Sequence, residues 1–202
     1  NDPIMIAIYS DILQRFRLAS TGKRPGTQPP LHLKDRIYKY FDPLPFWYPP
    51  LEDQVTDLSQ FTLNAITQRP MAMYHSWDSQ NAWLRQIHSH NYLFVNTATA
   101  LQHGIADGAW IWIESQWGKV KCMARHSEAV DPGTVWTWNA IGKAESAWSL
   151  TDNADESKKG FLLNHLISEE LPLGGFTVSN SDPITGQAGW YDVRVKLALA
   201  SE

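Results

Sequence analysis

The segment from Asn96 to Val120, NTATALQHGIADGAWIWIESQWGKV, limits the possible folds of this chain more than any other part of it. Asn96 and Thr97 can accept hydrogen bonds from the free amides at the start of a helix through Ala98 to His103. Gly104 suits the left-handed residue that ends such a helix. We therefore expect a short, capped helix of about two turns.

A β-hairpin is predicted directly after this helix. Asp107-Gly108 supplies a tight turn, and the strand Ala109 to Glu114 then alternates tryptophan with isoleucine, so that both of its faces are apolar. The turn from Ser115 to Gly118 returns the chain into a partner strand that runs to His126. Helix, turn and hairpin therefore form one compact unit.

The sequence pattern of this unit resembles that of a known domain at six residues, namely Gly104, Ile105, Asp107, Gly108, Ser115 and Gly118. Their order is similar to that in the molybdopterin-dinucleotide-binding domain, the C-terminal part of catalytic subunits in the dimethyl-sulfoxide-reductase family of molybdenum enzymes. The resemblance implies a mainly β fold with a few helices, built on a six-stranded double-psi β-barrel.

Composition limits the class of protein. Hydrophobic residues make up 43% of the chain and charged residues 19%, which describes a folded globular protein, and the net charge of −4 argues against a general nucleic-acid binder. No run approaches the roughly 20 apolar residues that cross a bilayer. The single cysteine, Cys122, excludes an internal disulfide and any iron–sulfur or cysteine-rich zinc site built by this chain alone.

The start of the chain, NDPIMIAIYS, has no initiating Met and no basic signal region, so we expect a fragment of a longer protein. Residues 1–60 are predicted to be an extension, with an amphipathic helix from Pro3 to about Ala19 that ends near Gly22. A second short helix is expected over His32–Phe41. The proline-rich segment FDPLPFWYPP that follows is expected to lie across another surface.

Residues 61–202 are predicted to form the barrel domain, because short strands separated by turn signals replace the earlier pattern. The expected strands are 61–67, 71–75, 92–96, 109–114, 118–126, 134–137 and 190–199. Expected helices cover 81–88, 98–103 and 156–170, the last because Phe161, Leu162, His165, Leu166 and Glu169 recur at helical spacing.

The segment RPMAMYHSWDSQNAWL, from Arg69 onward, passes from a strand to a helix through polar and aromatic residues. Free amides and hydroxyls at such a junction suit a phosphate or a heterocycle rich in hydrogen-bonding groups. The resemblance implies that His75, Ser76, Ser79 and Asn81 contact the cofactor. A purely structural alternative is that Ser79 caps the helix and His75 is a hydrogen-bonded turn residue.

Three later segments also resemble the family. Asp131-Pro-Gly-Thr-Val-Trp-Thr-Trp-Asn-Ala-Ile-Gly implies cofactor contacts at Asn139 and Gly142, because an amide can pair with a pterin edge and glycine lets the backbone approach closely. Asn164 stands in the family's Asn-x-Leu element, although a packing or capping role is the alternative. The final segment, DPITGQ, implies a contact at Gln187. The family often has Lys or Gln near the position of Tyr191, so the role of Tyr191 stays open.

Other patterns point to no independent catalytic centre and no metal site in this chain. G-x-S-x-G, HExxH and Walker motifs are all missing from the sequence, and the pair His88-x-His90 has no third ligand nearby. Ten tryptophans, among them Trp110, Trp112, Trp136 and Trp138, raise the alternative of a carbohydrate-binding module. Another alternative is an interface domain that has lost cofactor binding.

Within the family, RPMAMYHSW, EAVDPGTVWTWNAIGK and SNSDPITGQ are most similar to subunits of the sulfite dehydrogenase and polysulfide or thiosulfate reductase type. The resemblance implies bis(molybdopterin guanine dinucleotide), with iron–sulfur clusters only outside this chain. It also implies three partners, which are the rest of the catalytic subunit, a membrane anchor and an iron–sulfur subunit, together with a cytoplasmic or periplasmic location at the membrane. The fragment alone is expected to be inactive, and its contact residues to converge on one groove.

Overall fold

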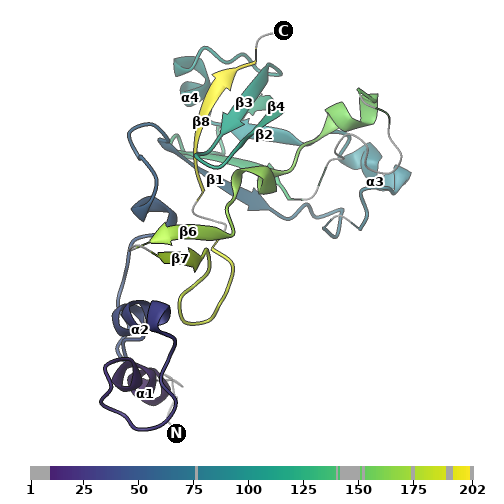
Figure 1. The fold of residues 1–202 in the computed structure, drawn as a ribbon. Helices are drawn as coiled ribbons and strands as arrows, with labels where there is room; N and C mark the ends of the chain where they lie inside the picture. Colours follow the sequence, from purple (N-terminus) through teal and green to yellow (C-terminus); the bar gives the residue numbers. More distant parts are fainter. Residues whose placement is uncertain are drawn as a thin grey trace, which may run out of the picture.

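A computed structural model describes residues 10–75, 77–139, 141, 151, 153–173, 176–189 and 193–200. Its centre is a closed barrel of six strands in the order β1-β5-β2-β4-β3-β8 (Figure 1). The strands are β1 Leu63–Gln68, β2 Tyr92–Val95, β3 Trp110–Glu114, β4 Lys119–His126, β5 Thr134–Trp138 and β8 Val193–Leu199. The prediction of a mainly β fold with a six-stranded barrel is confirmed.

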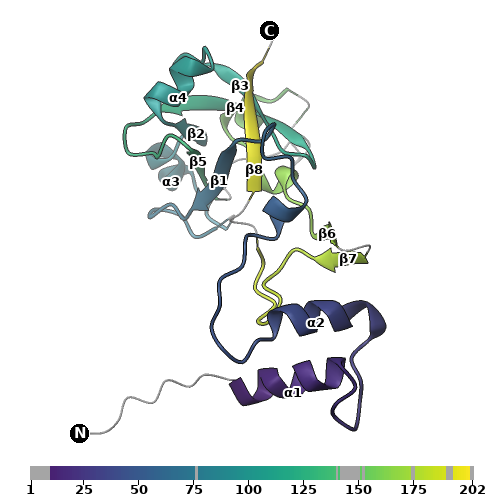
Figure 2. The same ribbon diagram turned by 90° about the vertical axis from the view of Figure 1, so that its left-hand side faces the viewer.

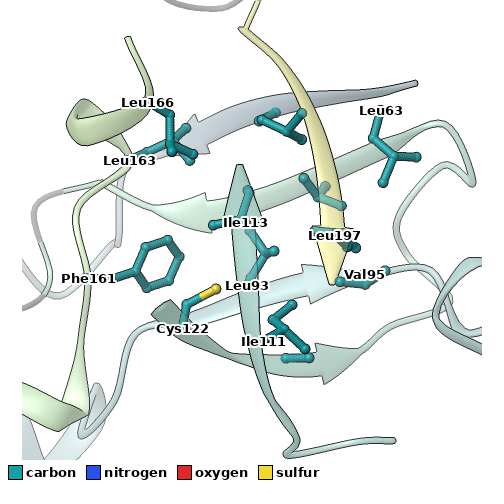
Figure 3. Packing of buried hydrophobic residues seen from close by; sticks show 14 of the residues in the cluster. Leu63, Leu93, Val95, Ile111, Ile113, Cys122, Phe161, Leu163, Leu166 and Leu197 are labelled. Carbon is teal, nitrogen blue, oxygen red and sulfur yellow. The ribbon is translucent and has the colours of Figure 1, made fainter. Parts of the chain in front are cut away.

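Alternation along the strands fills the barrel. Ile111 and Ile113 of β3 have no exposed surface, whereas Trp110 and Trp112 between them face outward and are half-buried. Figure 3 shows Leu93, Ile111 and Cys122 from three different strands pointing into the same interior. Burying such side chains contributes roughly 1.5–3 kcal/mol each, so this interior is the main source of the barrel's stability.

Two parallel strand pairs shape the barrel, since β1 runs parallel to β5 and β2 runs parallel to β4. Parallel pairs need long crossovers, and the helices lie in them: α3 Ala82–Ile87 between β1 and β2, and α4 Thr97–Gln102 between β2 and β3. The side chain of Asn96 accepts from the Ala98 amide at 3.0 Å, as predicted for the cap of α4.

The extension places its purple helices away from the barrel in both views (Figures 1 and 2), and its later part meets the barrel, where Asp53 forms an ion pair with Arg194 at 2.7 Å. It contains α1 Ser10–Ser20, the 3-10 helix η1 Leu31–Leu33, α2 Lys34–Tyr40 and the 3-10 helix η2 Glu52–Gln54. A two-stranded sheet, β6 Glu170–Leu173 and β7 Phe176–Ser179, lies between α2 and the barrel. A second apolar cluster of Tyr40, Leu51, Leu171 and Val178 joins this sheet to the extension.

Two predicted elements are wrong. Residues 156–170 do not form one helix, because Gly160 is extended and separates the 3-10 helices η4 Asp155–Lys159 and η5 Leu163–Leu166. Residues 71–75 form turns instead of a strand, and His75 has a positive φ of 50°, which interrupts extended backbone. The strands β6 and β7 were not predicted, since Pro172 and a short length hide them in the sequence.

The remaining predicted elements agree with the structure to within a few residues. The first helix is seen from Ser10, and its expected start at Pro3 lies outside the described residues, as do residues 190–192 of the last strand. Within the described ranges, no helix is long and apolar enough to span a membrane. The division into residues 1–60 and 61–202 stays a prediction.

Candidate cofactor-binding site

One end of the barrel collects the segments that the sequence singled out. β1 and β5 are parallel and finish together at Gln68 and Trp138, and the antiparallel β8 begins beside them, with Val193 opposite Ala65. We call this the β1/β5 end. The loop 69–81 and Asn139 therefore leave the barrel at the end where β8 begins.

Two buried polar atoms at the β1/β5 end lack hydrogen-bond partners within the described part of the chain. They are Thr67 Oγ1 and Asn139 Oδ1. Thr67 continues the inward alternation of Leu63 and Ala65, and the backbone N–H of Asn139 donates to the Gln68 carbonyl at 2.8 Å. Since an unsatisfied buried acceptor costs about 1–3 kcal/mol, these atoms suit a ligand that supplies hydrogen-bond donors.

Asn91 organises a polar layer just inside the same end and is only 2% exposed. Its amide nitrogen donates to the carbonyls of Trp138 at 3.0 Å and Phe161 at 3.2 Å, and its oxygen accepts from the Thr137 hydroxyl at 2.9 Å. This side chain ties the segment around Phe161 to strands β2 and β5. The sequence analysis did not identify Asn91, although a polar residue directly before a buried strand could have indicated it.

The loop 69–81 holds its polar residues through internal bonds. Asp78 accepts from the Tyr74 amide at 2.7 Å, and His75 packs its ring edge-on against the Tyr74 ring at 4.9 Å. The positive φ of His75 is uncommon for a residue with a side chain and costs of order 1–3 kcal/mol. Such strain marks the loop as a candidate binding element.

Asn81, not Ser79, caps the helix that follows. Asn81 Oδ1 accepts from the amides of Trp83 at 3.0 Å and Leu84 at 3.4 Å, so this oxygen is already used within the protein. Ser79 is 6% exposed and lines a small cavity together with Ile141. The structure therefore brings Ser79 close to the segment that carries Asn139.

Asn164 and Gln187 are exposed, and neither lines the small cavity that Ser79 lines. Asn164 is an exposed residue of η5, and Gln187 is exposed and lines a cavity of about 140 Å³ with Tyr48 and Asp182. Ser79 and Gln187 thus line different cavities. Ser76, Gly142 and Tyr191 lie outside the described residues, and the convergence of all the contacts on one groove stays a prediction.

The residues of segment 96–120 that carry the family resemblance stabilise the turns of the barrel. Gly104 and Gly108 have φ values of 65° and 79°, and Asp107 Oδ1 accepts from the His126 amide at 2.8 Å. A Cβ atom at Gly118 would collide with the His165 carbonyl oxygen. The Ser115 hydroxyl donates to the Leu166 carbonyl at 2.7 Å, so this hairpin turn fixes the segment around Asn164.

The described ranges contain no group of three or more His, Cys, Asp or Glu side chains that could hold a metal ion. His88 instead packs against the Trp138 ring at 5.5 Å, and His90 stacks on Tyr92 at 5.6 Å. Cys122 is buried, and burial raises the pKa of its thiol. It is a neutral core residue, as predicted.

The tryptophan faces are already in contact with other side chains. Lys119 Nζ lies 4.9 Å from the centre of the Trp112 ring, and Lys121 Nζ lies 5.6 Å from that of Trp110. Trp136 stacks on Phe94 with ring centres 4.0 Å apart. Trp110 and Trp112 line a groove of about 610 Å³ with Phe161 and His165, and the lysines that contact the two rings line it as well.

Comparison with protein families decides the class of this domain. The model of the molybdopterin dinucleotide binding domain matches residues 63–171, which cover all the barrel strands except β8. The chain belongs to this family. The buried acceptors at the β1/β5 end fit a molybdopterin dinucleotide, because the pterin and guanine edges carry N–H donors.

Individual relatives agree with this assignment. The chain is 66% identical over 201 residues to a sulfite dehydrogenase subunit of Allochromatium vinosum, covering 98% of this chain and 21% of that protein. It is 27% identical over 100 residues to dopamine dehydroxylase of Eggerthella lenta, covering 46% of this chain and 10% of that one. The chain thus spans about a fifth or less of the length of these relatives.

A solved structure supports the fold. Acetylene hydratase from Pelobacter acetylenicus matches with a TM-score of 0.62 at 19% identity, over 83% of this chain and 22% of that one. At this identity the likeness shows the fold alone. None of these comparisons supports a carbohydrate-binding module.

Proposed function

We propose that this chain is the C-terminal, cofactor-binding part of the catalytic subunit of a molybdenum oxidoreductase that acts on an inorganic sulfur compound. The observation that carries the proposal is the 66% identity, over nearly the whole chain, to one of the subunits of a sulfite dehydrogenase. Sulfite is therefore the first candidate substrate, with polysulfide and thiosulfate as the others. Residues 61–202 form the binding domain, and residues 1–60 form an extension.

The residues of this chain bind and orient the cofactor, molybdopterin guanine dinucleotide, which the complete enzyme holds in its bis form. Asn139 Oδ1 and Thr67 Oγ1 supply buried acceptors. His75, Ser76 and Ser79 belong to the proposed contact set through the loop that follows β1. Asn81, Gly142, Asn164 and Gln187 complete the proposed contacts. When bound, the cofactor supplies a molybdenum centre that changes oxidation state during transfer of oxygen or sulfur.

Partners follow from the same relative, whose name marks it as one subunit of an assembly. The proposed partners are the rest of the catalytic subunit, an iron–sulfur subunit that receives electrons and a membrane anchor subunit. In this assembly the domain lies at the membrane through its partners, on the cytoplasmic side or the periplasmic side. The catalytic groups lie outside this chain, so the chain alone is inactive.

Purification of the full-length protein tests the proposal. We expect stoichiometric molybdenum and pterin, and reduction of an artificial electron acceptor that depends on sulfite. Polysulfide and thiosulfate are assayed in parallel, since faster turnover of either one would replace sulfite as the substrate. A full-length protein without pterin would refute the cofactor-binding proposal itself.

A cofactor-site variant separates binding from folding. Asn139→Ala removes a proposed contact from the β1/β5 end, and we expect a lower pterin content without loss of the folded barrel. Asn64→Ala is the matched control, because Asn64 lies on the same barrel near the opposite end of the β1–β5 pair. Equal pterin content in the two variants would remove Asn139 from the site.

A further inference from the structure

The loop before β8, residues 180–189, is closed on itself through Asp182. Asp182 Oδ1 accepts from the amides of Ile184 at 3.0 Å and Thr185 at 2.7 Å, and from the Thr185 hydroxyl at 2.8 Å. The Asp182 amide donates to the Gln187 carbonyl at 2.6 Å. These bonds set the direction in which the Gln187 side chain leaves the loop.

Three side chains of the extension hold the same loop from outside. The Tyr48 hydroxyl donates to Asp182 Oδ2 at 2.8 Å. Arg36 donates to the carbonyls of Ser179 at 3.3 Å and Ser181 at 2.9 Å, and Glu52 accepts from the Asn180 side chain at 3.3 Å. In Figure 2 the yellow-green loop before β8 reaches down to α2, so these contacts bridge the extension and the barrel.

The bond from Tyr48 reaches Asp182, the carboxylate through which the loop closes on itself. Its ring is fixed between Tyr40, at 4.9 Å, and Phe46, at 5.7 Å. Partial burial opposes ionisation of Asp182, but bonds from the Thr185 amide and the Tyr48 hydroxyl outweigh it and lower the pKa of this carboxyl. At neutral pH the hydroxyl therefore donates to a carboxylate, which makes a stronger hydrogen bond than a neutral acceptor does.

We propose that Tyr48 is a positioning residue that holds the loop 180–189 so that Gln187 meets the dinucleotide. This inference rests on the proposed function, because it takes Gln187 as a cofactor contact. It gives the extension a role in cofactor binding although none of its residues belongs to the proposed contact set. Arg36 and Glu52 contact Ser181 and Asn180 at the start of the loop, and Tyr48 fixes the carboxylate of Asp182.

Hydrogen exchange in the full-length holoenzyme measures directly how firmly Tyr48 holds the loop 180–189. In Tyr48→Phe we expect the amides of Ile184 and Thr185 to exchange on the order of tenfold faster, because one charge-assisted bond to their common acceptor is lost. Tyr38→Phe is the matched control, since Tyr38 lies on the exposed side of the same helix α2 as Tyr40. Unchanged exchange in Tyr48→Phe would overturn the proposal that Tyr48 holds this loop.

Pterin release distinguishes positioning from a purely structural role. At urea concentrations below the unfolding transition, we expect pterin to dissociate several-fold faster from Tyr48→Phe, with an unfolding midpoint like that of Tyr38→Phe. Gln187→Ala should also release pterin faster but leave the Ile184 and Thr185 exchange unchanged. The double variant should release pterin no faster than Gln187→Ala alone, because Tyr48 acts through Gln187.

Each failure has its own signature. Faster exchange with unchanged pterin release would overturn the link from Tyr48 to the cofactor. Additive release rates in the double variant would mean that Tyr48 does not act through Gln187. A wild-type holoenzyme preparation without pterin would instead overturn the proposed function, and the inference with it.

Discussion

Replacing Asn91 with alanine should destabilise the domain more than any other single amide deletion proposed for this chain. Its side chain makes three hydrogen bonds, to the carbonyls of Trp138 and Phe161 and from the hydroxyl of Thr137. At about 1 kcal/mol net for each bond, Asn91→Ala should lower the free energy of unfolding by about 3 kcal/mol. Urea denaturation followed by tryptophan fluorescence measures this change.

A double-mutant cycle isolates the part that belongs to Thr137. Asn91→Ala removes the 2.9 Å partner of the Thr137 hydroxyl and leaves it the longer contact of 3.4 Å to the Trp138 carbonyl, so Thr137→Val in that background should restore up to about 1 kcal/mol. Asn164→Ala is the control, because Asn164 is exposed and its removal should change stability by less than about 0.5 kcal/mol. A loss below about 1 kcal/mol for Asn91→Ala, or purely additive effects in the cycle, would refute the reasoning.

Three further predictions concern the scaffold, the site and the loop. Gly118→Ala should cost about 2 kcal/mol in thermal unfolding, because the new Cβ meets the His165 carbonyl oxygen, whereas a Cβ at Gly133 meets only a side-chain oxygen and should cost less. Asn139→Leu should keep or raise the free energy of unfolding by up to about 1 kcal/mol while pterin content falls, since it removes a buried acceptor without a partner in the described chain; a large loss of stability would contradict this. Asp182 has a lowered pKa, so its stabilisation is present above the unfolded pKa and lost as the pH falls below about 4. Unfolding midpoints measured against pH should therefore fall less steeply in acid for Asp182→Asn, and an unchanged slope would count against this assignment.

The segment 96–120 was predicted well because its structure depends on residues close together in sequence. Asn96 caps α4 by accepting from the Ala98 amide, and Gly104 and Gly108 adopt positive φ values. The hairpin then pairs Glu114 with Lys119 across a short turn. Local rules for caps, turns and alternation are sufficient for such a unit.

The region 156–170 was predicted wrongly because distant residues take its backbone groups. The Lys159 carbonyl accepts from the backbone N–H of Asn91 at 2.7 Å, and the Leu166 carbonyl accepts from the Ser115 hydroxyl at 2.7 Å. Those carbonyls would bond within an α-helix, so tertiary contacts replaced the helix that the apolar spacing indicated. The spacing had a different cause, since Phe161 enters the barrel core from the segment before η5, and Leu163 and Leu166 enter it from the 3-10 helix η5.

The candidate site was predictable in part. Asn139 came from the family resemblance and stays a prediction, and the structure adds a buried oxygen without a partner in the described chain. Thr67 could have been found from the alternation of Leu63 and Ala65 into the core, which places the next odd residue at the barrel end. The proposed role of Tyr48 was not predictable, because the bond to Asp182 joins residues that only the folded chain brings together.

The strand order has a consequence for the time at which this domain can fold. β8 pairs with β1 on one side and with β3 on the other, so Leu63 finds its partner only when Val195 has been made. On the ribosome the other five strands have two open edges until residues 193–199 emerge. Barrel closure therefore waits for the synthesis of β8, and until then the exposed edges of β1 and β3 are available to a chaperone or to another strand.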